Sequence, residues 1–121
     1  MIVDDGKLAR MALGKVLSGL RPDWSRLEAA NADEAVSMVK SAAPDIAIFD
    51  FNMPGRDGLA LAAETRSLRP DMPIAVISAN HQQEVVDRAQ AMGAQFLSKP
   101  ITEQGLRDFV SSAEKKVKGG A

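Results

Sequence analysis

Five polar side chains stand at or just after the ends of short apolar runs in this sequence of 121 residues: Asp4, Asp5, Asp50, Ser78 and Lys99. If the fold gathers them, the three carboxylates repel one another, because two charges about 4 Å apart at an effective dielectric of about 20 cost on the order of 4 kcal/mol. A cation must then lie among them. Lys99 offers one positive charge, and an oxygen-only ligand set without His or Cys favours Mg²⁺ before Ca²⁺ or Mn²⁺. These residue types therefore predict a magnesium site with open positions for water or phosphoryl oxygens.

Each of these residues alone has a commoner structural interpretation. An Asp pair after a strand often caps a helix, a Ser at a strand end often bonds to the backbone, and a lone Lys is usually solvated. Their joint occurrence favours a site. Two other sites do not fit the segment that starts at Asp50: an EF-hand loop needs a bidentate Glu where Leu61 stands, and a haloacid-dehalogenase-type phosphatase needs an acid where Asn52 stands. The sequence also contains no glycine-rich phosphate loop.

The elements that position these residues follow from an alternation of β-rich apolar runs and longer stretches with helical period. The runs predict five strands: Met1–Val3, Arg26–Ala30, Ile46–Phe49, Ile74–Ile77 and Gln95–Leu97. Strict alternation with helices predicts an α/β fold, a single doubly wound (βα)5 domain whose parallel sheet is covered on both faces. The carboxyl ends of the strands meet at one edge, where the polar side chains converge. Periodicity does not determine the strand order, and the flavodoxin-like order 2-1-3-4-5 is one candidate.

Five amphipathic helices are expected to connect and follow the strands. The apolar stripe of the first helix consists of Ala9, Leu13, Val16, Leu17 and Leu20. The stripe of the second consists of Ala35, Val36, Met38 and Val39, behind a capping box of Asn31 and Glu34. The other helices are predicted at Leu59–Leu68 before Pro70, at Gln82–Met92 before a left-handed Gly93, and from a cap at Thr102 to about Val117.

The composition limits the class of protein. The length corresponds to about one domain, and 15 basic against 16 acidic residues give a net charge of −1, so direct nucleic-acid binding is not expected. The absence of cysteine excludes disulfides and thiolate metal sites and suits a reducing compartment, so the cytoplasm is the predicted location. No apolar run in the sequence approaches the roughly 20 residues that cross a membrane, and no membrane partner is expected.

Four motifs in the same order resemble those of response-regulator receiver domains of two-component signalling. They are the pair Asp4-Asp5, the segment Asp50-x-x-Met53-Pro54-Gly55-x-Asp57-Gly58, Ser78-Ala79 and Lys99-Pro100. The resemblance covers nearly the whole chain, with a receiver domain at 1–118 and a tail or linker start at 119–121. It implies the 2-1-3-4-5 sheet and phosphorylation of Asp50. It also implies Mg²⁺ bound by Asp5, Asp50 and the backbone carbonyl of Asn52, with Asp4 assisting through water.

The resemblance further implies a mechanism and partners. Asp50 would take a phosphoryl group from a phosphohistidine of a sensor histidine kinase or a histidine phosphotransfer protein. Lys99 and Ser78 would bind the phosphoryl oxygens, and Phe96 would swing inward as Ser78 moves. The surface of the fourth helix, fifth strand and fifth helix would then change its affinity for a downstream protein or a fused output domain. Such a domain catalyses its own phosphotransfer and dephosphorylation and does not turn over free substrates.

Two alternatives remain open on the sequence. One is a receiver-like interaction module that is never phosphorylated, against which the retained acidic, Ser and Lys residues argue. The other is a metal-dependent phosphatase for free monoesters, for which no meaningful turnover is expected. Since Met1–Val3 alone precede Asp4 in this sequence, the sequence predicts either a short first strand or residues that are missing before Met1. Asn52, Asn80 and His81 flank the predicted site at positions where similar receiver domains tune the attack of water on the acyl phosphate.

Overall fold

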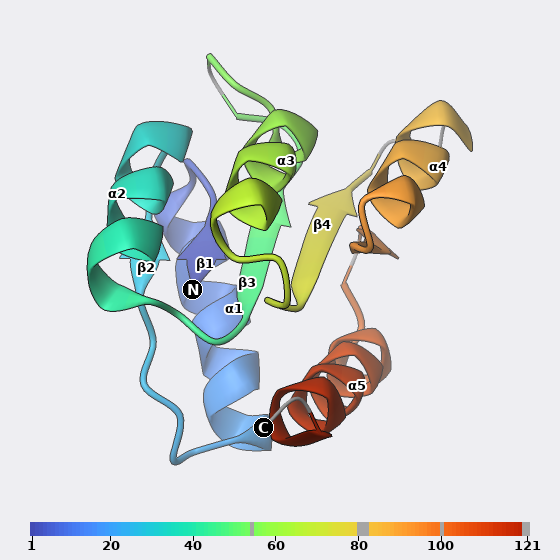
Figure 1. Ribbon diagram of the computed structural model, residues 1–121. Coiled ribbons are helices and arrows are strands. Elements are labelled where there is room, and N and C mark those ends of the chain that lie inside the picture. The colour runs from blue at the N-terminus through green and yellow to red at the C-terminus, as the bar shows by residue number, and fades with distance from the viewer. Residues whose placement is uncertain (54, 80–82, 100, 120–121) are drawn as a thin grey trace.

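The computed structural model describes residues 1–53, 55–79, 83–99 and 101–119, with the backbone alone for 117–119. Within these residues strands and helices alternate strictly (Figure 1). The strands are β1 (Ile2–Val3), β2 (Glu28–Ala29), β3 (Ala47–Asp50), β4 (Ile74–Ser78) and β5 (Gln95–Ser98). The helices are α1 (Lys7–Leu20), α2 (Ala32–Ala42), α3 (Gly58–Leu68), α4 (Gln83–Ala91) and α5 (Glu103–Gly119). The strands pair in parallel in the order β2-β1-β3-β4-β5, which confirms the predicted fold class and the order that the family resemblance implied.

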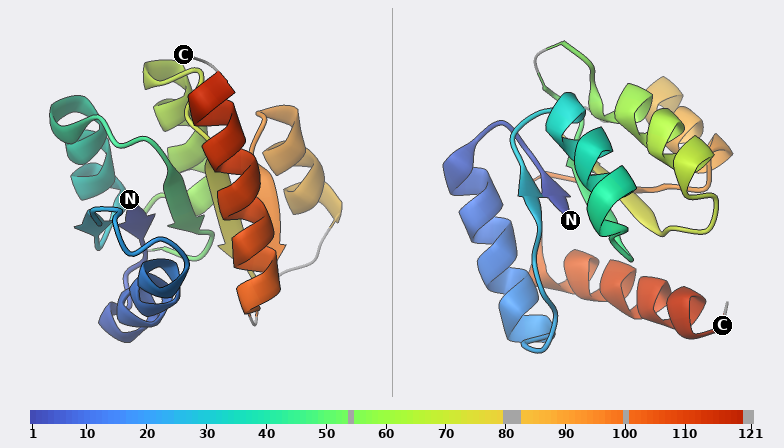
Figure 2. Two further views of the ribbon diagram at one scale, coloured as in Figure 1. Left: turned by 90° about the horizontal axis from the view of Figure 1, so that it is seen from below. Right: turned by 60° about the vertical axis from the view of Figure 1, so that its left-hand side comes forward.

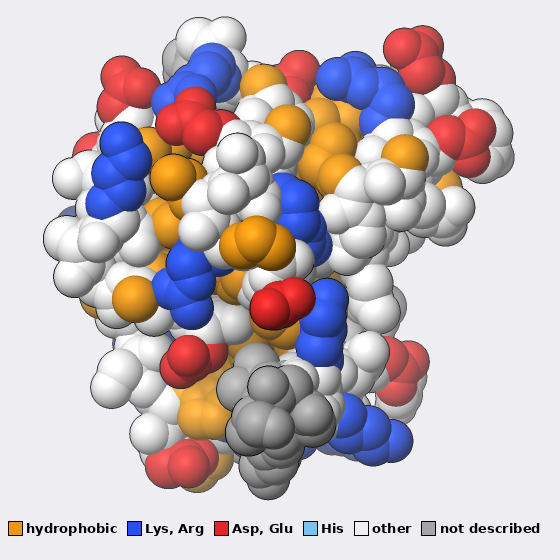
Figure 3. Space-filling model, in the orientation of Figure 1, with side chains coloured by type: hydrophobic (Ala, Val, Ile, Leu, Met, Phe, Trp, Pro, Cys, Tyr) orange, Lys and Arg blue, Asp and Glu red, His pale blue; other side chains and the backbone are white. Residues whose placement is uncertain are grey.

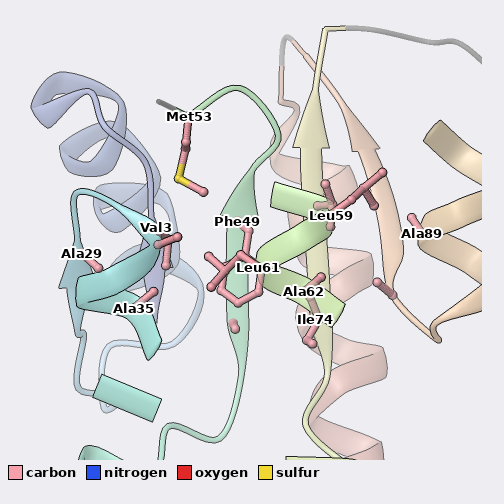
Figure 4. Packing of buried hydrophobic residues seen from close by; sticks show 14 of the residues in the cluster. Val3, Ala29, Ala35, Phe49, Met53, Leu59, Leu61, Ala62, Ile74 and Ala89 are labelled. Carbon is pink, nitrogen blue, oxygen red and sulfur yellow. The ribbon is translucent and has the colours of Figure 1, made fainter. Parts of the chain in front are cut away.

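Helices cover both faces of the sheet (Figures 1 and 2). Because side chains alternate along a strand, neighbouring residues of β3 point to opposite faces. Phe49 packs in a cluster with residues of α2, α3 and α4, while Ile48 packs with residues of α1 and α5. Figure 4 shows the first cluster, in which side chains of β1, β3 and β4 meet those of α2 and α3. None of the described helices combines the length and apolarity needed to cross a membrane.

Three predicted helix signals are confirmed. The Asn31 side chain accepts a hydrogen bond of 2.9 Å from the backbone N–H of Glu34 at the start of α2. Thr102 Oγ1 accepts one of 3.0 Å from the backbone N–H of Gly105 at the start of α5. Gly93 has a φ of 73° after α4, a left-handed conformation that glycine adopts without a side-chain clash. These local signals determine where the helices begin and end, and therefore the lengths of the loops at both ends of the sheet.

Some element boundaries differ from the prediction. β2 spans two residues instead of Arg26–Ala30, because it lies at the edge of the described sheet and pairs with the short β1. α4 ends at Ala91, and its predicted first residue, Gln82, lies outside the described residues. α5 continues through Gly119, beyond the predicted end near Val117. The predicted tail at 119–121 overlaps α5 at its first residue and otherwise lies outside the described residues, so the division of the chain after 118 stays a prediction.

The predicted apolar stripe of α1 is wrong in part. Leu13 and Leu17 are buried against the sheet as predicted, but Ala9 and Val16 are exposed. Apolar residues occur around much of the circumference of α1, so their period does not decide which side packs. α1 packs through the side that carries Leu13 and Leu17. Ala9 and Val16, together with Leu13, line an open groove near the carboxyl end of the sheet.

Candidate functional site

Three carboxylates meet at the carboxyl end of the sheet, where β1 and β3 end side by side. Val3 pairs with Phe49, so Asp4 follows β1 next to Asp50, the last residue of β3. One carboxylate oxygen from each of Asp4, Asp5 and Asp50 lies within 4.8 Å of the other two. Asp4 and Asp50 are buried, and Asp5 is exposed. The structure thus gathers the three carboxylates into one acidic cluster, two inside the protein and one at its surface.

Asp4 is held by both its backbone and its side chain. Its N–H donates a hydrogen bond of 3.1 Å to the carbonyl of Ala29, which continues the pairing of β1 with β2. Its Oδ1 accepts one of 2.8 Å from the backbone N–H of Gly6, where the chain turns into α1. Arg10 of α1 donates from Nη1 to the backbone carbonyl of Asp4 at 2.6 Å. We did not predict Arg10 from the sequence, because nothing in the pattern of α1 indicates partners on other elements.

Asp50 carries a buried oxygen that accepts no hydrogen bond from the described residues. Nζ of Lys99 lies 3.1 Å from Oδ1 of Asp50 as an ion pair, but no described group forms a hydrogen bond of normal geometry with this oxygen. Burial raises the pKa of Asp50 above its ordinary value; the contact with Lys99 lowers it, and the negative charge of Asp4 raises it again, with a net upward shift. A buried carboxylate with an unsatisfied oxygen and acidic neighbours is suited to bind a cation or to act as a nucleophile.

β4 and β5 bring a hydroxyl and an ammonium group to the same end of the sheet. Asp50 pairs with Ile77, and Ser78 pairs with Ser98. The backbone N–H of Lys99 donates a hydrogen bond of 3.0 Å to the carbonyl of Ser78, which keeps these two residues adjacent. Ser78 is buried, and the side chain of Lys99 is 39% exposed. The hydroxyl and the ammonium therefore come from the two strands that follow β3 in the sheet.

The loop after β3 passes close to Asp50 before α3 begins. The backbone N–H of Gly58 donates to the carbonyl of Phe51 at 2.9 Å. A Cβ on Gly58 would lie 2.5 Å from the backbone oxygen of Asp50, which is a steric clash. Only glycine, which has no Cβ, fits at this position. The side chain of Asp57 accepts a hydrogen bond of 2.8 Å from the N–H of Ala60 and caps α3. Asp57 and Gly58 therefore shape the loop that carries Asp50 to α3.

Two further residues predicted from the sequence lie nearby. Asn52 is exposed in the loop after β3, and its backbone hydrogen bond to Asp50 lowers the pKa of that carboxyl. Ligation of a metal by the Asn52 carbonyl stays a prediction. Phe96 on β5 is half-buried and packs against the cluster shared by α2, α3 and α4, and its movement also stays a prediction. Four residues of the predicted motifs and their flanks lie outside the described residues: Pro54, Asn80, His81 and Pro100.

A groove of about 640 Å³ opens from the acidic cluster between α1 and α5. Asp4 and Lys99 line the part next to the cluster. Apolar side chains of α1, among them Ala9 and Val16, line the groove from one side, and Ile101 and Leu106 line it from the side of α5. Leu8, also on α1, is 81% exposed. The carboxyl end of the sheet is therefore accessible from the side of α1.

The face of the protein that α2, α3 and α4 cover carries charges of both signs. On the face covered by α2, α3 and α4, acidic and basic side chains are interspersed (Figure 3). The described residues of this face form no continuous basic surface. This distribution agrees with the net charge of −1 of the sequence.

Comparisons with known proteins agree on one family. A family model described as the response regulator receiver domain matches residues 1–111. The chain is 34% identical over 119 residues to the positive alginate biosynthesis regulatory protein of Pseudomonas aeruginosa, which covers 95% of this chain and 46% of that protein. It is 35% identical over 117 residues to the transcriptional regulatory protein PdtaR of Mycobacterium tuberculosis, covering 94% of this chain and 54% of that protein.

The fold is similar to a solved structure of the chemotaxis protein CheY4 of Vibrio cholerae. The TM-score is 0.81 at 25% identity, and the similarity covers 93% of this chain and 94% of the other. In contrast, the chain spans about half the length of the curated relatives it matches. The similarity therefore concerns one domain of those relatives.

Proposed function

The chain belongs to the response regulator receiver domain family, and from this premise we propose that it is a signalling domain switched by phosphorylation of Asp50. One observation carries the proposal: the oxygens of Asp4, Asp5 and Asp50 lie within 4.8 Å of one another, and Nζ of Lys99 lies 3.1 Å from Asp50. The phosphoryl donor is a phosphohistidine on a sensor histidine kinase or on a histidine phosphotransfer protein.

The reaction is a transfer of the phosphoryl group from nitrogen to oxygen. A carboxylate oxygen of Asp50 attacks phosphorus and forms an O–P bond, while the P–N bond of the phosphohistidine breaks. The electron pair of the broken bond stays on the ring nitrogen, and neutral imidazole is regained after proton transfer. The ammonium of Lys99 stabilises negative charge on the phosphoryl oxygens, and the hydroxyl of Ser78 donates a hydrogen bond to one of them. Attack by water on phosphorus later breaks the O–P bond, releases inorganic phosphate and returns the carboxylate of Asp50. The domain therefore catalyses both its own phosphorylation and its own dephosphorylation.

The acidic cluster fits a magnesium ion. Its ligand atoms are all carboxylate oxygens, and the buried Oδ1 of Asp50, which lacks a hydrogen bond from any described residue, can be satisfied by a hard cation. Asp5, Asp50 and the backbone carbonyl of Asn52 would hold the ion, with Asp4 assisting through water. When bound, Mg²⁺ supplies positive charge that lowers the repulsion between the carboxylates and an incoming phosphoryl group.

Phosphorylation starts the switch by adding charge and hydrogen-bond acceptors next to Ser78. Ser78 moves toward the phosphoryl group, Phe96 turns inward on the adjacent strand, and the surface of α4, β5 and α5 changes its affinity for a downstream protein or a fused output domain. The pairing of Phe96 with Val76, two residues before Ser78, supports this coupling. The names of the two regulatory relatives support a regulatory output. The absence of cysteine supports a cytoplasmic location.

Incubation with acetyl phosphate and Mg²⁺, followed by measurement of the intact mass, tests the proposed function. We expect the wild type to gain one phosphoryl group, EDTA to prevent the gain, and Asp50→Asn to gain none. Asp57→Asn is the matched control, since it lies in the same loop and keeps the helix cap, and it should still be phosphorylated. A wild type that gains no mass would indicate the unphosphorylated interaction module. Continuous release of phosphate from simple monoesters would indicate the phosphatase.

A further inference from the structure

We propose that Arg10 is a positioning residue that holds the Asp4–Asp5 segment in place for cation binding. The inference rests on the proposed function, because it requires the acidic cluster to bind a divalent cation. Arg10 contributes no ligand atom to the cluster. It acts through the backbone of Asp4, whose carbonyl accepts its hydrogen bond.

The guanidinium of Arg10 joins three elements of the fold. Nη1 donates to the backbone carbonyl of Asp4 after β1 at 2.6 Å, and Nε donates to Oε1 of Glu28 on β2 at 3.2 Å. Glu28 in turn pairs with Ile2 of β1. The Arg10 side chain is 16% exposed. Because the donors of a guanidinium have fixed directions, this contact fixes α1 against the end of β1 and the edge strand β2.

The Asp4–Asp5 segment needs such support because β1 is two residues long. The N–H of Asp4 bonds to Ala29 and its side chain bonds to Gly6, while its carbonyl bonds to Arg10. The direction of that carbonyl determines the orientation of the rigid peptide plane between Asp4 and Asp5. It therefore determines the direction in which the Asp5 side chain leaves the backbone. Asp5 is the exposed member of the cluster, so Arg10 orients the carboxylate that burial does not hold.

The charge of Arg10 and its hydrogen bond act on cation binding in opposite directions. A guanidinium close to the cluster repels a divalent cation, so electrostatics alone predicts that removing Arg10 tightens binding. Loss of the hydrogen bond weakens binding, because the carboxylates no longer converge. The ion pair with Glu28 compensates part of the charge of Arg10, which favours the second effect. Removal of Arg10 therefore tightens cation binding if its charge dominates and weakens cation binding if its hydrogen bond dominates.

Titration with Mn²⁺, followed by electron paramagnetic resonance with Mg²⁺ as competitor, measures cation affinity without phosphorylation. We expect Arg10→Gln to weaken Mn²⁺ binding about tenfold, and Arg10→Lys, which keeps the charge but loses the fork, to weaken it about threefold. Lys15→Gln removes the same charge from the exposed side of α1 and should change the affinity less than about twofold. Glu28→Gln keeps the bond from Arg10 to Asp4 and should also stay within about twofold. Circular dichroism of each variant verifies folding.

The results overturn different parts of the account. If the Arg10→Gln variant binds Mn²⁺ as tightly as the wild type, or more tightly, the positioning role of Arg10 is overturned. If that variant does not fold, Arg10→Lys decides, and wild-type affinity there overturns the role. The wild type is expected to bind Mn²⁺ at a site that Asp5→Asn abolishes. If the wild type shows no such site, both the cation site of the proposed function and this inference are overturned. That failure is read from the wild type and Asp5→Asn alone, so it is distinguishable from a failure of Arg10.

Discussion

The two ends of the sheet bury charge in different ways. At the amino end, the ammonium of Met1 donates a hydrogen bond of 2.7 Å to the carbonyl of Ile46. Burial lowers the pKa of this ammonium to about 6, and the carboxylate of Asp45 offsets part of the shift. At the carboxyl end, Asp4 and Asp50 are buried side by side with like charges. One backbone carbonyl holds a single buried amino group at one end, whereas two buried carboxylates lie together at the other.

The two ends also differ in how α1 and α5 pack. At the amino end, Nε of Arg21 on the α1 side forms an ion pair of 2.6 Å with Glu114 of α5, and its guanidinium lies 6.0 Å from the centre of the Trp24 ring. The pocket there measures about 40 Å³, whereas the same two helices border a groove of about 640 Å³ at the carboxyl end. Stability and function are therefore largely separated along the strands. Substitutions at the amino end should change stability more than phosphorylation, and those at the carboxyl end should change phosphorylation more than stability.

The largest effect is expected from Lys99→Gln at the carboxyl end. The rate of phosphorylation by acetyl phosphate should fall about 100-fold, because a preorganised cationic donor to the transferring oxygens is lost. Intact-mass measurements over time give the rate. Lys15→Gln, which removes a charge from the exposed side of α1, should keep the wild-type rate. A wild-type rate in Lys99→Gln would remove Lys99 from the mechanism.

Arg66→Ala tests the amino end. Arg66 donates to four backbone carbonyls next to the starts of β4 and β5: Pro70 at 3.0 Å, Met72 at 2.5 Å, Met92 at 2.9 Å and Gly93 at 3.2 Å. Losing these charge-assisted bonds should lower the free energy of unfolding by about 2 to 3 kcal/mol in a urea titration. The free energy of unfolding of Arg66→Lys should lie between those of Arg66→Ala and the wild type. The folded fraction of Arg66→Ala should be phosphorylated at the wild-type rate, and a slower rate would contradict the separation of the two ends.

In a chain that begins at Met1, the buried ammonium of this residue predicts a pH dependence of stability. Its pKa is about 6 in the folded chain against an ordinary value of 8.0, so between these values the unfolded chain binds more protons and the free energy of unfolding rises with pH. The free energy of unfolding rises by on the order of 2 kcal/mol in total. It levels off at pH values below the pKa of the folded chain and above the pKa of the unfolded chain. Urea titrations across this range measure it. A chain acetylated at its N-terminus should lack this part of the rise, and equal curves for both chains would refute the assignment to Met1.

The smallest effect is expected from Asp50→Asn measured as stability in EDTA. The variant should be about 1 kcal/mol more stable than the wild type, because it removes a buried negative charge that Asp4 repels. Saturating Mg²⁺ should stabilise the wild type more than the variant. Asp57→Asn serves as the control, with a stability close to that of the wild type. An Asp50→Asn protein less stable than the wild type in EDTA would show that repulsion does not dominate in the cluster.

The sheet and the gathering of the carboxylates were predictable because both depend on local patterns. Apolar runs of strand length predict the strands, and a polar residue such as Asp50 at the end of such a run must lie at the carboxyl edge of a parallel sheet. The strand order came from the family resemblance, since periodicity carries no information about it.

The packing side of α1 and the contacts of the arginines were not predictable in the same way. Ala9 and Val16 fit an apolar stripe as well as Leu13 does, and all three line the groove between α1 and α5, but only Leu13 is buried. Arg10 and Arg66 bond to backbone carbonyls of other elements, and a sequence pattern does not show which carbonyls lie within reach. Such contacts depend on tertiary structure and leave no spacing signal in the chain.

Reductive trapping tests most directly whether Asp50 carries the phosphoryl group. Borohydride converts an aspartyl phosphate into homoserine, and peptide mass spectrometry locates the converted residue. After treatment with acetyl phosphate and Mg²⁺, we predict homoserine at position 50, and none when either reagent is omitted. Conversion at Asp4 or Asp5 instead of Asp50, or at no position in the chain, would contradict the central claim.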